Sequence, residues 1–144
     1  MPGGHCADDR GMTIDWNRYW WVPGFAAGFL AVGVPYWLLP YGKVDLPNPL
    51  LGAGLLVVIV AAALTRFYSG RPFLQVAAVM GSVFPAVVMV RVAVEVSRDP
   101  TSHNLWPFEV VIAMFVGGVA ALPGTMLGSL ASWWSRRGQA VSRR

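Results

Sequence analysis

The sequence predicts an all-α integral membrane protein, a four-transmembrane-helix bundle whose N and C termini both lie in the cytoplasm. Three observations predict this fold class: the scarcity of charge, the length of the uncharged intervals, and the placement of basic and aromatic residues around them. Hydrophobic residues make up 56% of the 144 positions and charged residues only 12%, whereas a soluble domain carries about 25% charge. A water-soluble globule is therefore not expected.

Four intervals contain no Asp, Glu, Lys or Arg: residues 19–42, 46–65, 72–90 and 110–135. A helix needs about 18 apolar residues to cross a hydrocarbon core of about 30 Å, and each interval reaches that length. Backbone amides in lipid must bond within their own segment, which favours helices over strands. We expect a transmembrane domain over residues 19–135, with spans at 20–39, 49–66, 72–97 and 107–134.

The residues at the span boundaries support these assignments. The first apolar run is longer than a signal-peptide core and lacks a small-x-small cleavage site, so we expect it to remain as a membrane anchor. Asn48 and Pro49 are typical of the cap and first position of a helix, Pro72 opens the third span, and Pro107 falls in the first turn of the fourth. Three interior prolines predict local changes of helix shape or hinges. These are Pro35, Pro85 and Pro123.

Two tails flank the expected bundle. Residues 1–18 are polar and Gly-rich, and we expect a flexible tail in which Met12 offers an alternative start; residues 136–144 form a basic C-terminal tail. The single cysteine, Cys6, cannot form an internal disulfide and has no metal-ligand spacing.

The basic residues predict the orientation of the bundle. In a four-span arrangement eight of them fall on one side and three on the other, which places both termini in the cytoplasm of a bacterial inner (plasma) membrane. All seven tryptophans lie near the expected water boundaries, as in the aromatic belts of membrane proteins. Because the basic residues flank apolar spans, the net charge of +4 reflects topology, and nucleic-acid binding is not expected.

A stripe of small residues on the fourth span predicts close helix packing. Ala120, Gly124, Gly128 and Ser132 recur every fourth residue, and Gly24 with Gly28 repeats the spacing on the first span. Association of helices in lipid depends on such close van der Waals contact. The stripe serves either packing within the bundle or an interface with a second copy or another membrane subunit.

A polar cluster is expected at the outer end of the third and fourth spans. Its members are Arg91, Glu95, Arg98, Asp99, His103 and Glu109. Arg91, Glu95 and Arg98 share one helical face, and charges at this depth should pair, Arg91 with Glu95 within its helix or with Glu109 across helices.

Several chemical interpretations of this cluster remain open. It can be a salt-bridged structural clamp, a site for a lipid headgroup or quinone, a site for a hard cation, or an acid–base pair. No HExxH motif, second nearby histidine or marked nucleophile accompanies it. We therefore expect no metal, no cofactor and no catalytic residue, and an enzyme is the less favoured interpretation.

The middle of every expected span lacks an ionisable residue. Ion-coupled pumps and transporters generally need one there, so a proton antiporter is disfavoured. We expect a non-catalytic helix-packing component, either self-associating or an accessory subunit of a membrane complex. The alternatives are a channel or transporter for a small or lipid-like solute, and a membrane enzyme or binder that holds a lipid headgroup or quinone at the outer cluster.

Overall fold

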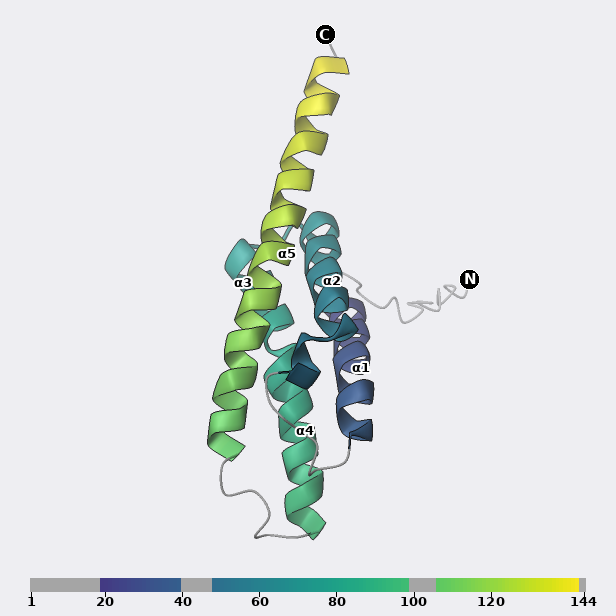
Figure 1. The fold of residues 1–144 in the computed structure, drawn as a ribbon. Helices are drawn as coiled ribbons and strands as arrows, with labels where there is room; N and C mark the ends of the chain where they lie inside the picture. Colours follow the sequence, from purple (N-terminus) through teal and green to yellow (C-terminus); the bar gives the residue numbers. More distant parts are fainter. Residues whose placement is uncertain (1–18, 40–47, 99–105, 143–144) are drawn as a thin grey trace, which may run out of the picture.

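The computed structural model describes residues 19–39, 48–98 and 106–142 (Figure 1). The regular elements of these ranges are all helical, and we keep one label for each. They are α1 (Val22–Leu38), the 3₁₀ turn η2 (Asn48–Leu51), α2 (Ala53–Ser69), α3 (Phe73–Gly81), α4 (Val83–Arg98) and α5 (Trp106–Ser142). α1 and the α3–α4 pair run in one direction, and α2 and α5 run in the other (Figure 1). The architecture is thus an antiparallel, all-α arrangement of four helical segments.

Two helical segments are long and apolar enough to cross a membrane: Phe73–Ser97, which joins α3 to α4, and Trp106–Gln139 of α5. α1 and α2 are shorter apolar helices of 17 residues each. Seventeen residues is the lower end of the length that spans a hydrocarbon core, about 17–25 residues. By length and composition the helices therefore suggest membrane association.

The third expected span is interrupted once, at Ser82, where α3 ends and α4 begins. Pro85 follows three residues later, and it lacks the N–H that would bond the carbonyl of Gly81 in a continuous helix. The chain continues across the break because the Ser82 N–H bonds the Ala78 carbonyl and the Ala86 N–H bonds the Ser82 carbonyl, both at 3.0 Å. Pro85 therefore changes the helix locally without ending the span.

The other boundaries differ from expectation by a few residues. Asn48 and Pro49 begin the 3₁₀ turn η2, and α2 itself starts at Ala53, because Gly52 is extended at its N-cap. α2 ends at Ser69, and the next residue, Gly70, has a φ of 61°, the left-handed conformation that favours glycine at a helix end.

α5 is the longest helix, with 37 residues, and is about 55 Å long at 1.5 Å per residue. It passes through Pro123 without ending. Its C-terminal turns project beyond the ends of α2 and α3 and contain most of the residues expected to form a basic tail (Figure 1). Arg136 and Arg137 stabilise these turns through contacts four residues back, with Ser132 and Trp133.

The core is apolar, and small residues let the helices approach closely. Val58, Val76, Met80, Phe84 and Val87 are fully buried. An added Cβ on Gly54 of α2 would lie 2.8 Å from the Ala31 carbonyl oxygen of α1, so these two backbones are nearly in contact.

The outer surface is apolar as well. Large hydrophobic side chains are exposed on every helix, and those of α5 follow one another along most of its length. They include Phe108, Val111, Met114, Phe115, Val119, Leu122, Met126, Leu127, Leu130 and Trp134. A monomeric soluble protein rarely exposes a continuous apolar surface of this extent, whereas such a surface is suited to contact with lipid or with a partner helix.

Candidate functional site

Arg91 of α4, a member of the predicted outer polar cluster, is 7% exposed. Its Nε donates to Glu95 Oε1 at 2.8 Å, within the same helix. Its Nη1 and Nη2 donate to the backbone carbonyls of Tyr36 at 2.7 Å and of Leu39 at 3.0 Å. Three of the five guanidinium N–H groups thus hold structural partners on two helices.

These bonds close the C-terminal end of α1. The last carbonyls of a helix have no partner within the helix and carry the negative end of its dipole, so a buried cation there satisfies both. The Arg91 guanidinium also stacks over the Tyr36 ring, with its Cζ 4.8 Å from the ring centroid. Tyr36 itself is buried, at 1% exposed.

A second contact joins the C-terminal end of α1 to α4. The Trp37 indole N–H donates to the Val87 carbonyl of α4 at 3.2 Å, and its ring packs edge-on against Phe29, 5.3 Å between centroids. A hollow of about 330 Å³ lies beside the Arg91–Glu95 pair and is otherwise lined by Trp37, Val90 and Val94. The walls of this hollow are apolar, and the charges of Arg91 and Glu95 neutralise each other. The hollow therefore presents little unpaired charge to a ligand.

The other cluster residues divide between described and undescribed parts of the chain. Glu109 lies half-buried in the first turn of α5 and, like Glu95, within electrostatic range of the Tyr36 hydroxyl. Arg98 is the last residue of α4, and its side chain lies outside the described residues, as do Asp99 and His103. Of the two pairings expected for Arg91, the one with Glu95 is present. Within the ranges described, no three His, Cys, Asp or Glu residues gather as metal ligands.

Two of the predicted packing residues of α5, Gly124 and Gly128, face α2 of the same chain. A Cβ on Gly124 would overlap the Ile59 carbonyl oxygen, and a Cβ on Gly128 would overlap that of Ala63. Ala120 is fully buried, and Ser132 lies half-buried one turn beyond Gly128.

The glycines of α1 meet other helices. A Cβ on Gly24 would lie 2.5 Å from Thr65 Oγ1 of α2 and 2.9 Å from Met80 Cε of α3. One on Gly28 would lie 3.0 Å from a Val58 methyl group. The predicted small residues thus bring helices of one bundle together.

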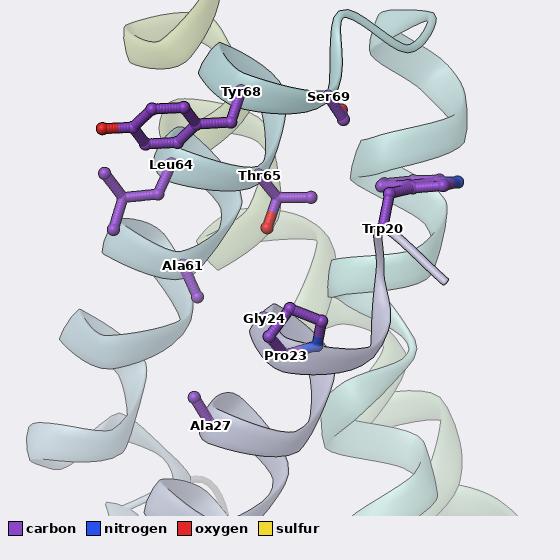
Figure 2. A pocket seen from close by; sticks show the side chains of 9 residues that line it. All are labelled: Trp20, Pro23, Gly24, Ala27, Ala61, Leu64, Thr65, Tyr68 and Ser69. Carbon is purple, nitrogen blue, oxygen red and sulfur yellow. The ribbon is translucent and has the colours of Figure 1, made fainter. Parts of the chain in front are cut away.

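An open apolar groove of about 410 Å³ runs between α1 and α2, near the start of α1 (Figure 2). Gly24, Ala27 and Ala61 leave space at its base, with Trp20, Leu64, Thr65 and Tyr68 around it (Figure 2). A second hollow, of about 370 Å³, shares Ala27, Ala61 and Leu64 and extends along the same face. Their shape and composition suit an acyl chain or a neighbouring helix, and their lining carries no carboxylate, imidazole or thiol.

Sequence reasoning missed three relationships. The carbonyls of Tyr36 and Leu39 are main-chain groups, so no side-chain pattern marks them as partners of Arg91. Gly117 of α5 lies against Gly81 of α3, a contact that only the Gly117–Gly118 doublet could have suggested. The third is a pocket with Arg66 and Arg136 in its lining; Arg136 continues the four-residue spacing of the small stripe beyond Ser132.

No protein-family model, curated protein or solved structure matches this chain.

Proposed function

We propose that this chain is a polytopic protein of a bacterial inner membrane that crosses the bilayer four times, has both termini in the cytoplasm, and works as a non-catalytic helix-packing component. It would self-associate or serve as an accessory subunit of a larger membrane complex. The protein would act as a scaffold, and its function would lie in the surface that the bundle presents to other helices.

The proposal rests mainly on the hydrogen-bond partners of the buried Arg91 guanidinium. A buried charge is costly, and in a catalyst or transporter it usually faces a substrate or an ion pathway. Here the guanidinium is directed at the α1 carbonyls and at Glu95, which supports a role in fixing the helix ends.

The packing at mid-depth points the same way. Val83, Phe84, Val87 and Ala113 are fully buried and apolar. Thr125 is the only buried serine or threonine in the described chain, and its hydroxyl bonds the Ala121 and Leu122 carbonyls of its own helix at 2.9 Å. Such an interior favours a closed scaffold over a polar conduction path.

The experiment is purification of the full chain from membranes in a mild detergent, followed by native mass spectrometry and by solute-flux assays in proteoliposomes. The proposal predicts a complex of defined stoichiometry, with itself or with one other subunit, and no flux. A strict monomer with solute flux, or with a turnover lost on changing Glu95 or Glu109, would refute it.

A further inference from the structure

The end of the bundle opposite Arg91 contains a polar pocket between α2 and α5. It has a volume of about 260 Å³ and is lined by Arg66, Phe67, Gly70, Ser132, Ser135 and Arg136. Two guanidinium groups and two hydroxyls therefore border one hollow, and no acidic side chain is part of its lining.

The close packing of α2 on α5 positions Arg66. A Cβ on Gly128 would lie 2.9 Å from Arg66 Cβ, so the arginine stem runs directly over the α5 backbone. Its Nε donates to Ser129 Oγ at 3.1 Å, and that hydroxyl in turn donates to the Thr125 carbonyl at 2.8 Å. The half-buried guanidinium is thus held through Nε, which leaves its two Nη groups as donors.

Arg136 approaches from α5. Its Nε donates to the Ser132 carbonyl at 3.2 Å, and its Nη2 to Ser132 Oγ at 3.3 Å. In the described ranges neither Arg66 nor Arg136 has a carboxylate partner. Two like charges on one hollow repel each other, and an anion between them removes that repulsion while accepting charge-assisted hydrogen bonds.

We infer that this pocket binds a phosphate group, and that its source is the headgroup of an anionic phospholipid. Exposed aromatic side chains mark the level of the pocket: Tyr68 on α2, and Trp133 and Trp134 on α5. Aromatic residues concentrate at the headgroup level of membranes, and basic pockets between helices on the cytoplasmic side bind anionic headgroups. The assignment of the phosphate to a lipid headgroup rests on the proposed membrane orientation. The binding of a phosphate group between the two arginines does not depend on that orientation.

The test measures binding of phosphatidylglycerol and of phosphatidylcholine to the detergent-solubilised full chain by native mass spectrometry, with inorganic phosphate as a competitor. Arg66→Gln and Arg136→Gln should each weaken phosphatidylglycerol binding roughly fivefold, the loss expected for one arginine at an anionic headgroup. Arg137→Gln is the matched control, because the Arg137 guanidinium stacks on Trp133, 3.6 Å from the ring centroid, and does not line the pocket. Its effect should stay below about twofold.

Three results would overturn the inference. Equal binding of the two lipids would show that the chain does not recognise the charge of the headgroup. Equal weakening by all three variants would show that the basic charge of this region, and not the pocket, attracts the lipid. If inorganic phosphate binds tightly and displaces the lipid, the phosphate group that the pocket binds comes from free phosphate and not from a lipid headgroup. Because Arg136 is exposed, Arg136→Gln keeps the test valid if Arg66→Gln fails to fold. Extraction of the chain by alkaline carbonate would refute the membrane proposal separately, without changing the phosphate titration.

Discussion

The Nη1 atom of Arg91 lies 2.7 Å from the carbonyl oxygen of Tyr36, 55 positions earlier in the sequence. This bond places the most buried cation of the described chain at the C-terminal end of α1, where unpaired carbonyls need a donor. With the bond to Leu39 and the ion pair to Glu95, it joins α1 to α4 at the end of the bundle opposite the Arg66 pocket.

Replacing Arg91 with methionine should destabilise the protein by about 3 kcal/mol, because two carbonyls and Glu95 lose a charged donor in a desolvated position. The apparent melting temperature in detergent should fall by roughly 6–12 °C. Glu95→Gln should cost less than Arg91→Met, because it keeps both carbonyl bonds of Arg91 and leaves an amide oxygen where the partly exposed carboxylate accepted from Nε. Equal losses from the two variants would argue against capping of α1 as the main role of Arg91.

Gly117 and Gly118 are adjacent on α5 and should respond oppositely to alanine. A Cβ on Gly117 would overlap the Gly81 carbonyl oxygen of α3, whereas nothing lies within 4 Å of one on Gly118. Gly117→Ala should therefore cost about 1–3 kcal/mol through overpacking. Gly118→Ala should be neutral or stabilise the helix by up to about 1 kcal/mol. Thermal unfolding in one detergent compares them directly, and a tolerated Gly117→Ala would mean that α3 and α5 are not this close.

Gly128→Ala should separate α2 from α5, because its Cβ would overlap the Ala63 carbonyl oxygen and press on Arg66 Cβ. We expect a loss of about 1–3 kcal/mol in stability. Gly138→Ala, on the same helix with open space around it, is the control and should change stability by no more than about 1 kcal/mol. Disulfide cross-linking between cysteines placed on α2 and α5 gives a second measure. An unchanged cross-linking rate in Gly128→Ala would contradict the packing described.

The coarse fold could be predicted from the sequence because charge-free intervals set both the number and the approximate bounds of the helical segments. The position of the break between α3 and α4, at Ser82, could not be predicted from the sequence. Pro85 shows only that a carbonyl up to four residues earlier has no N–H donor within the helix. The extent of α5 was underestimated because a basic tail and an exposed helix with contacts four residues apart have similar composition.

The sequence predicted the contacts between side chains of the candidate site, but not the contacts of those side chains with the backbone. The four-residue spacing of Arg91 and Glu95 already predicts their ion pair. The larger role of Arg91, in closing α1, depends on backbone carbonyls that look alike in any sequence. The spacing of Gly124 and Gly128 likewise predicts a close contact but does not identify α2 as the helix that fills it.

The most direct test of the four-span account concerns the side of the membrane on which η2 lies. In spheroplasts, an impermeant maleimide is applied to Asn48→Cys and Gly138→Cys variants that also carry Cys6→Ser. Four spans predict that the Asn48→Cys variant is labelled without permeabilisation and the Gly138→Cys variant only after it. If both variants need permeabilisation, α1 and α2 do not cross the bilayer, only the two long helical segments span it, and the account is contradicted.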